Sequence, residues 1–223
     1  MKIISIIPAR GGSKGVPKKN IKRFLNKPLI SHSIEYSQSS KKIIETYVST
    51  DDMKIKKISE EHNVKVIDRP KEISGDTATT ESAVEHVLQN IKFEPDIIVL
   101  LQPTSPLRPL NSLEKAINHF IDNNYDSLLS ISPTHNFIWN ISNNIAHPSY
   151  DYINRPRRQD LNEKDINYIE NGSLYIFKYS NFMKYKNRLG GKIGYIIFEE
   201  KYAMEIDTKL DFLILEEISK RFN

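Results

Sequence analysis

The sequence predicts an α/β fold in which a mostly parallel sheet is sandwiched by helices. The expected strands are continuous apolar runs, which is typical of strands that are buried on both faces. Along the first part of the chain, these expected strands alternate with stretches that have the features of helices, as in α/β proteins. Ligands of such sheets bind outside the carboxyl ends of the strands. We therefore expect loops 8–20, 49–52, 69–80 and 102–108 to meet there.

The strand runs are short, and Ile97–Leu101 is the clearest because every residue in it is apolar. The other expected strands are Ile3–Ile7, Tyr47–Thr50, Val64–Ile67, Ser127–Ile131, Ser173–Phe177 and Ile193–Phe198.

The helices between these strands are predicted from residues that favour helix N-termini. Pro28 suits a first helical turn, because a proline there loses no hydrogen bond. Thr79 or Thr80 can cap a helix whose first turn holds Glu81. The remaining helices are expected through Ile55 and Ile58, after Ser112, and after a cap at Asp207 or Thr208, the last of them with one apolar face.

The alternation of strands and helices stops between Pro133 and Glu170. This stretch is rich in Asn, His, Pro and Tyr, and it contains the only tryptophan, Trp139. It is too long for an ordinary loop. We interpret residues 133–170 as a small inserted dimerisation subdomain within a single domain that spans residues 1–223, with a flexible lid as the alternative.

The composition excludes several classes of function. The chain has no cysteine, which rules out disulfides, thiolate metal ligands and thiol nucleophiles. No apolar stretch approaches the ~18 residues of a membrane span, and the N-terminus lacks the pattern of a secretion signal. The isoelectric point near 9.0 raises the question of nucleic acid, but no basic and aromatic recognition stripe is present. We expect a cytoplasmic protein without a nucleic-acid or membrane partner.

The positive charge is concentrated at the N-terminal end. Residues 1–34 contain eight Lys or Arg and no acid, and without them the formal net charge of +4 would be −4, from 24 basic and 28 acidic residues. Three of the eight glycines lie in Arg10–Gly15, directly after the first expected strand. A flexible cationic loop in this position predicts an anion site, such as one for phosphate. A glycine-rich turn without a ligand is the competing interpretation, because the spacing matches neither G-x-G-x-x-G nor a P-loop.

The stretch Ile7–Asn20 resembles the first signature of the CMP-sialic acid synthetases, also called acylneuraminate cytidylyltransferases. Later blocks follow in the order of that family and extend the resemblance over nearly the whole chain. They are Ser49–Asp52, Arg69-Pro70 with Gly75–Thr80, Gln102–Arg108, Arg157–Gln159, Asn171-Gly172 and Glu205–Thr208.

The resemblance implies a Rossmann-like nucleotidyltransferase that acts on CTP and a nine-carbon 2-keto sugar acid, in the presence of Mg²⁺ or alternatively Mn²⁺. The products would be the CMP-sugar, a donor for surface glycans, and pyrophosphate. In phosphoryl transfer, positioning and charge neutralisation supply most of the catalysis. The resemblance also implies a homodimer.

The same family implies roles for individual residues. Lys19 would stabilise charge on the α-phosphate, and Arg10 and Asp207 complete the expected catalytic set. Lys18 is interpreted as a solvated surface lysine. The residues expected to bind the nucleotide are Arg10, Gly11, Ser13, Lys14, Lys19, Asn20, Arg69, Ala78 and Thr80.

The sugar acid would be bound by Gln102, Thr104, Ser105, Arg157 and Tyr175. A guanidinium suits a carboxylate because it can donate two parallel hydrogen bonds, so Arg157 would hold the carboxylate of the sugar. The three prolines of Gln102–Arg108 make this loop stiff. The competing interpretations are a rigid turn for this loop and a solvated basic patch for Arg155, Arg157 and Arg158.

The metal ligands are the point at which this chain departs from the family. The family commonly has D-x-D where this chain has Glu205-Ile206-Asp207. Alternation still places both carboxylates on one side of an extended segment, so Asp207 and Glu205 are the expected ligands. Asp207 is the firmer of the two, and a helix N-cap is its competing role.

Two alternative functions remain open from the sequence. One is a CMP-KDO synthetase, since those enzymes share the fold and a related first loop, although the later blocks match less well. The other is a catalytically silent nucleotide- or sugar-binding regulator, which the Glu205 departure would favour. The sequence also leaves open whether the sugar acid is N-acetylneuraminate or an analogue such as legionaminic acid.

Overall fold

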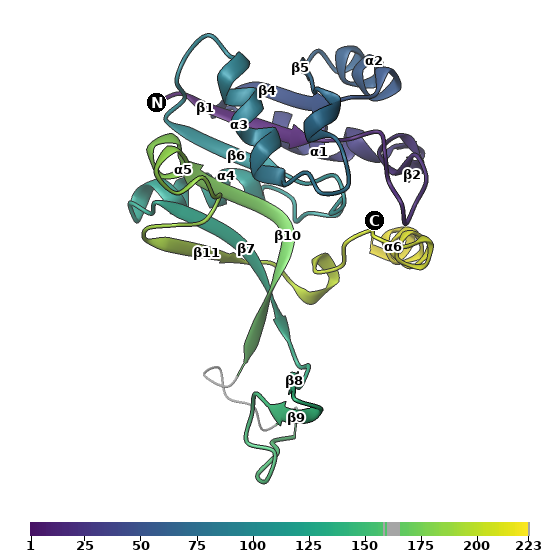
Figure 1. Ribbon diagram of the computed structural model, residues 1–223, viewed down its shortest axis with the longest axis vertical. Coiled ribbons are helices and arrows are strands. Elements are labelled where there is room, and N and C mark those ends of the chain that lie inside the picture. Colours follow the sequence, from purple (N-terminus) through teal and green to yellow (C-terminus); the bar gives the residue numbers. More distant parts are fainter. Residues whose placement is uncertain (158, 160–165, 223) are drawn as a thin grey trace.

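The computed structural model describes residues 1–157, 159 and 166–222. Its core is a seven-stranded sheet with the order β11-β7-β10-β6-β1-β4-β5 (Figure 1). β1 pairs in parallel with β4 and β6, and β10 runs antiparallel to β6 and β7. The strands are β1 (Ile3–Pro8), β4 (Ile43–Thr50), β5 (Lys65–Asp68), β6 (Ile97–Leu101), β7 (Ser127–Thr134), β10 (Asn167–Lys178) and β11 (Ile193–Ile197).

Helices cover both faces of the sheet, as the sequence predicts. In β6, Ile97, Val99 and Leu101 face one core, and the two residues between them face another. Helices α1, α2 and α4 contribute to the first core, and α3 and α5 contribute to the second. The helices are α1 (Leu29–Gln38), α2 (Met53–Glu61), α3 (Thr80–Asn90), α4 (Ser112–Asp122), α5 (Tyr179–Tyr185) and α6 (Lys209–Phe222), with 3-10 turns η1 (Lys19–Ile21), η2 (Lys71–Ile73) and η5 (Glu200–Tyr202).

The structure decides between the alternative caps. Thr79 is the cap of α3, because its side chain accepts a hydrogen bond from the Ser82 N–H. Thr208 caps α6: its hydroxyl accepts from the Asp211 N–H at 3.2 Å, while the Asp211 carboxylate accepts from the Thr208 N–H at 2.7 Å. This reciprocal pair is a capping box. Asp207 is therefore not needed as the cap.

Several short elements were not predicted. They are the hairpin of β2 (Arg23–Phe24) and β3 (Lys27–Pro28), the pair β8 (Trp139–Ser142) and β9 (Ile145–Pro148), and the helix α5. The turn of the first hairpin has left-handed backbone at Leu25 and Asn26. Leucine rarely adopts this conformation, so the sequence carries little signal for the turn.

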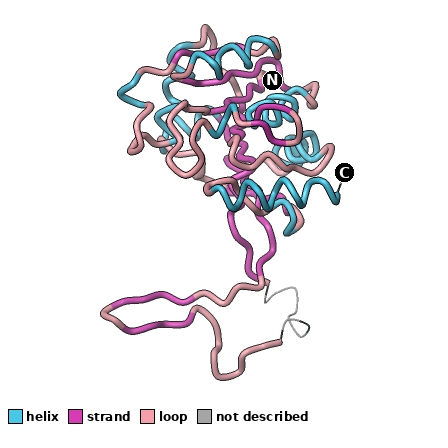
Figure 2. Tube along the Cα trace, turned by 90° about the vertical axis from the view of Figure 1, so that its right-hand side faces the viewer, coloured by secondary structure: helices cyan, strands magenta, loops and turns pink. Residues whose placement is uncertain are grey.

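The region expected as an insertion is a projecting arm, by which we mean the described residues between 135 and 166. It extends away from the body on the ends of β7 and β10 (Figures 1 and 2). These two strands stay paired out to Thr134 and Asn167. Pro133 and Glu170, the approximate bounds expected from the sequence, lie inside these paired strands, and the arm begins where the pairing ends.

A third, smaller core attaches the C-terminal helix to the loop after β1. Phe212 and Leu215 of α6 pack with Val16, Phe24 and Ile206. This packing brings the residues just before α6 next to the cationic loop. None of the helices in the described part of the chain has the length and apolar character that crossing a membrane demands. A cytoplasmic location stays a prediction.

Candidate active site

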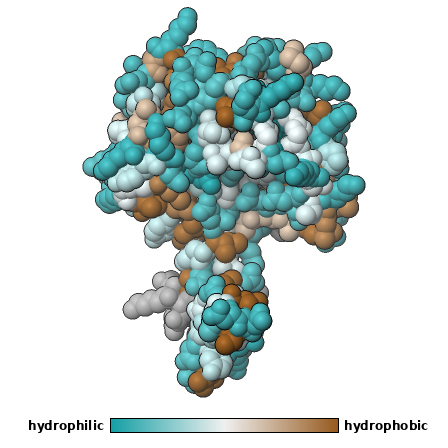
Figure 3. Space-filling view, viewed as in Figure 1, coloured by the Kyte–Doolittle hydropathy of each residue, from teal (hydrophilic) through white to brown (hydrophobic). Residues whose placement is uncertain are grey.

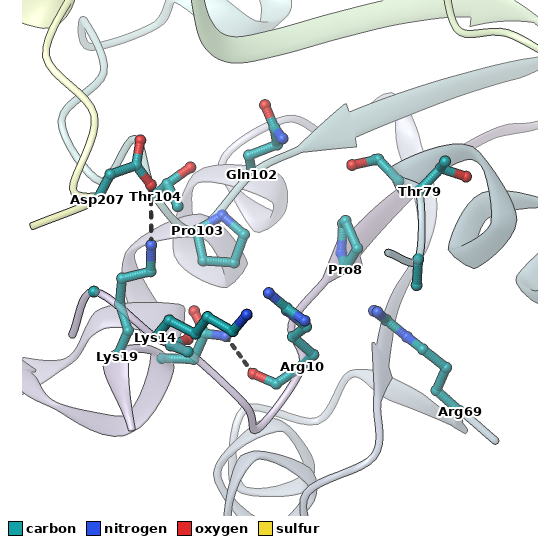
Figure 4. A pocket seen from close by; sticks show the side chains of 15 residues that line it. Pro8, Arg10, Lys14, Lys19, Arg69, Thr79, Gln102, Pro103, Thr104 and Asp207 are labelled. Carbon is teal, nitrogen blue, oxygen red and sulfur yellow. Dashed lines mark hydrogen bonds and ion pairs between the residues drawn. The ribbon is translucent and has the colours of Figure 1, made fainter. Parts of the chain in front are cut away.

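A pocket of about 340 Å³ lies outside the carboxyl ends of β1 and β6 (Figure 4). This is the edge at which the sequence predicts a site. The pocket is lined by Pro8, Arg10, Ser13, Lys14, Gly15, Lys19, Asn20, Arg69, Ala78, Thr79, Thr80, Gln102, Pro103, Thr104 and Asp207. Four segments distant in sequence therefore meet around one space, and cationic side chains form much of its wall.

Lys19 is held firmly at one side of the pocket. Its ammonium donates to the Ile206 carbonyl at 2.6 Å and to the Asp207 carboxylate at 3.3 Å, and its side chain is only 12% exposed. Gly15 makes this close approach possible, because an added Cβ would overlap with the Asp207 carbonyl oxygen. The Ile206 N–H also donates to the Thr104 carbonyl at 2.8 Å. The Lys19 side chain thus lines the pocket, and the Ile206 carbonyl fixes the position of its ammonium.

The Asp207 carboxylate is open to the pocket. Its side chain is 72% exposed, and within the described chain its ion-pair partner is Lys19. Because Thr208 and Asp211 form the capping box of α6, Asp207 is available for a ligand. Figure 4 shows its carboxylate and the Lys19 ammonium facing one another at one side of the pocket.

Glu205 lies deeper than Asp207. It accepts a hydrogen bond from the Thr104 hydroxyl at 3.1 Å. Burial raises its pKa, the Thr104 hydrogen bond opposes that effect, and the nearby Asp207 charge reinforces it. An added Cβ at Gly172, whose φ is +62°, would collide with the Glu205 carboxylate. A glycine with left-handed backbone therefore makes room for the longer acid.

A looser cation contact joins the first loop to the segment before α3. Arg10 and Lys14 both bind the carboxylate of Asp76, at 2.9 Å and 2.7 Å respectively. Lys14 lowers the pKa of Asp76 most, and Arg10 adds to that effect. Asp76 is therefore an anion at neutral pH. Asn20 supports the loop from beneath, since its amide donates to the Arg10 carbonyl at 2.9 Å.

Arg69 is buried at the far end of the pocket. Its guanidinium donates to the Ser49 hydroxyl at 3.0 Å and to the Ser49 carbonyl at 2.6 Å. Burial lowers its pKa to about 10, so it remains charged at neutral pH. Ala78 and Thr80 line the same pocket. These contacts tie the end of β4 to the pocket wall.

Five of the expected site residues do not line the pocket. The Gly11 N–H donates to the Asp51 carboxylate at 2.8 Å rather than facing the cavity. The Ser105 hydroxyl is buried and donates to the Asn171 carbonyl at 3.3 Å. Glu205 lies behind Thr104, which does line the pocket. Tyr175 and Arg157 are the other two.

Tyr175 and Arg157 are placed very differently. Tyr175 is buried in the second core, with its hydroxyl donating to the Glu170 carboxylate and the Arg188 guanidinium 4.6 Å above its ring. Arg157 is an exposed residue of the arm. Its neighbour Arg158 lies outside the described residues. The binding roles of all these residues stay predictions.

Several residues of the site were not identified from the sequence. Pro8, Gly15, Thr79 and Pro103 line the pocket, and Asp76 pairs with two of its cations. Arg108 is buried and donates to the carbonyls of Gln102 at 2.8 Å and Ser173 at 3.0 Å. Arg108 also stacks on Tyr36 at 5.0 Å. It therefore fastens the proline-rich loop to β10. The sequence did contain a signal for Arg108. It lies in the loop that follows β6, and a site is expected after that strand.

The carboxylates of the site suit a hard cation that takes some of its ligands from the protein and the others from a bound substrate. No group of three or more His, Asp or Glu side chains in the described residues is arranged to hold a metal by itself. Mg²⁺ characteristically takes one or two carboxylates and completes its shell with substrate phosphates and water. Asp207, with Glu205 behind it, fits that requirement.

Comparison with known proteins agrees with the geometry. Among curated proteins, N-acylneuraminate cytidylyltransferase A of Danio rerio is 32% identical over 225 residues, covering 99% of this chain and 51% of the relative. Post-translational flagellin modification protein B of Campylobacter coli is 28% identical over 236 residues, covering 99% of this chain and 96% of that protein. The chain thus spans about half the length of the first of these relatives.

The fold is shared with a solved structure of CMP:2-keto-3-deoxy-manno-octonic acid synthetase complexed with CTP. The TM-score is 0.73 at 17% identity, and each chain is covered over 100% of its length. At that identity the likeness shows the fold alone. The family profile described as Cytidylyltransferase matches residues 4–220, which is nearly the whole chain. This chain therefore belongs to the cytidylyltransferase family.

Proposed function

We propose that this chain transfers the CMP group of CTP to the anomeric hydroxyl of a nine-carbon 2-keto sugar acid and releases pyrophosphate. The observation that carries the proposal is the pocket at the carboxyl edge of the sheet, where the cations of the first loop meet Asp207. The name of the Danio rerio relative, N-acylneuraminate cytidylyltransferase A, supports a nonulosonic acid as the acceptor.

The nucleotide is proposed to lie along the pocket from Arg69 to Lys19. Arg69, Ala78 and Thr80 form one end and would contact cytidine. Arg10, Ser13 and Lys14 would bind the phosphates that leave, because their cationic and hydroxyl groups can donate hydrogen bonds to phosphate oxygens. Lys19, whose side chain is mostly shielded from solvent, would then reach the α-phosphate.

Lys19 is proposed to stabilise the reaction's developing charge. The oxygen of the anomeric hydroxyl loses its proton to water and forms a bond to the α-phosphorus, while the bond from that phosphorus to pyrophosphate breaks. Negative charge then accumulates on the phosphate oxygens. A lysine already oriented by the Ile206 carbonyl and the Asp207 carboxylate loses little freedom when it binds this charge.

Asp207 and Glu205 would hold a Mg²⁺ ion, whose contribution is to neutralise phosphate charge. Asp207 has the exposed carboxylate. Glu205 is oriented by the Thr104 hydroxyl. The extra methylene of Glu205 relative to aspartate is accommodated by the missing side chain at Gly172.

The sugar acid is proposed to bind against Gln102 and Thr104, with Ser105 and Tyr175 supporting that wall from behind. Arg157 belongs to the arm and does not line the pocket of its own chain. We therefore propose a homodimer in which the arm of one chain brings Arg157 to the other. Exposed apolar side chains on the arm, including Trp139, Ile141 and Ile153, suit such a contact. Figure 3 shows hydrophobic residues among hydrophilic ones on the surface of the arm. The sedimentation mass of the chain tests the dimer.

The substrate is tested directly with the purified chain, CTP and Mg²⁺. Parallel reactions contain N-acetylneuraminate, legionaminic acid or KDO, and pyrophosphate release is measured together with the mass of the CMP-sugar. We expect turnover with a nine-carbon acid. Turnover with KDO alone would make the chain a CMP-KDO synthetase, and no turnover with any acid would favour the silent regulator.

A further inference from the structure

Asp76 occupies the cations that the nucleotide phosphates would need. Its two carboxylate oxygens are divided between Arg10 and Lys14, at 2.9 Å and 2.7 Å. Both cations line the pocket, while Asp76 itself approaches from the loop before α3. The first loop of the chain therefore already has an internal anion.

The ion pairs of Asp76 with Arg10 and Lys14 are exposed to solvent and can therefore be exchanged. The side chains of Lys14 and Asp76 are 80% and 47% exposed, and that of Arg10 is 32% exposed. Exposed ion pairs contribute little to stability, because water and salt compete with them. The carboxylate is also far less charged than a polyphosphate, which can satisfy the same two cations with more oxygen atoms.

The surroundings of Asp76 allow it to move. It lies outside regular structure, between the end of η2 at Ile73 and the α3 cap Thr79. An added Cβ at the neighbouring Gly75 would meet no atom within 4 Å. The space beside this glycine is therefore open, whereas at the Lys19 contact an added Cβ at Gly15 would meet the Asp207 carbonyl oxygen.

We propose that Asp76 is an internal competitor of pyrophosphate, which re-pairs with Arg10 and Lys14 as the product leaves and so promotes its release. The inference rests on the proposed function for the order of events. It involves no covalent change: two ion pairs with pyrophosphate are exchanged for two ion pairs with the carboxylate. Asp76 touches the binding groups and not the reacting atoms.

The proposal is tested with Asp76→Asn, which keeps the shape and removes the charge. Pyrophosphate alone is titrated into the protein in a calorimeter without Mg²⁺, so that no turnover and no metal is involved. We expect affinity to increase by about three- to tenfold. Glu72→Gln is the matched control, since Glu72 lies on η2 of the same loop and contacts neither cation in the described structure. It changes the net charge equally and should leave the affinity within about twofold.

Two further measurements test whether the effect of Asp76→Asn acts through Arg10 and Lys14. In the Lys14→Met background the gain from Asp76→Asn should shrink, because only Arg10 remains to be released. In steady-state assays, Asp76→Asn should lower the inhibition constant of pyrophosphate by the same factor. Unchanged or weaker pyrophosphate binding by Asp76→Asn without Mg²⁺ would overturn the proposal. If the variant lost binding only in a second titration that contains Mg²⁺, Asp76 would be a metal ligand instead. If the wild type lacked turnover, the proposed function would fail while the binding result still stood.

Discussion

The pocket contains two contacts between cations and carboxylates, and the protein holds them very differently. At the inner contact, the Lys19 side chain is 12% exposed and binds a backbone carbonyl as well as Asp207. At the outer contact, the Lys14 side chain is 80% exposed and pairs with one carboxylate oxygen of Asp76. The chemistry is the same in both, so burial and backbone support decide which cation is fixed and which can exchange partners.

This difference matches the two tasks of a nucleotidyl transfer. The group at the reacting phosphate gains most from being oriented before the reaction, because no reorganisation is then required. The groups on the leaving phosphates must bind and later let go, since product release often limits turnover. Variants at the inner and outer contacts test this division of roles.

The largest effect is expected from Lys19→Met, which removes the inner cation and keeps the length of the side chain. We expect kcat to fall by about 10²- to 10³-fold, as for the loss of a preorganised charge-stabilising donor. Lys18→Met is the matched control, because Lys18 is the exposed neighbour and does not line the pocket. Equal losses in both variants would refute the special role of Lys19.

A smaller loss is expected from Asp207→Asn. The variant keeps the size of the side chain but removes the carboxylate that faces the pocket, so we expect kcat/KM to fall about 10- to 100-fold. The Mg²⁺ concentration for half-maximal rate should rise. Glu217→Gln, an exposed position on α6, serves as the control. An unchanged Mg²⁺ requirement would exclude Asp207 as a ligand.

Lys14→Met should affect binding rather than chemistry. Because the outer cation contacts the leaving phosphates in our proposal, we expect the KM for CTP to rise about three- to fivefold while kcat changes little. Steady-state kinetics at saturating sugar acid separates the two parameters. A fall in kcat comparable to that of Lys19→Met would erase the distinction between the inner and outer contacts.

The smallest effect is expected from Thr208→Ala, which removes the hydroxyl of the α6 capping box. A lost N-cap costs about 1 kcal/mol in the free energy of unfolding, which corresponds to a fall of about 2–4 °C in Tm. Thermal unfolding measures this, and Thr208→Ser should retain the stability. No change in Tm for Thr208→Ala would mean that the third core alone holds the segment before α6.

Much of the fold was predictable because its signals are local. Short runs rich in apolar residues marked every strand of the seven-stranded sheet, and the glycine-rich cationic loop marked the edge where the pocket lies. The lengths of β7 and β10 were not predictable, since their outer halves are stabilised by pairing with one another. Helix α5 has only seven residues, which is too few to establish a helical period.

The sequence by itself determined the α/β class, the sheet edge that carries the site and the family blocks that name its candidate residues. Only the tertiary structure decided which carboxylate each cation meets. Lys19 and Asp207 are 188 residues apart, and they meet because α6 packs on the loop after β1. The pairing of Arg10 and Lys14 with Asp76, and the choice of Thr208 over Asp207 as the cap, are likewise decided in three dimensions. The physical reason is that an ion pair or a cap depends on distances between segments, and residue order alone does not specify those distances.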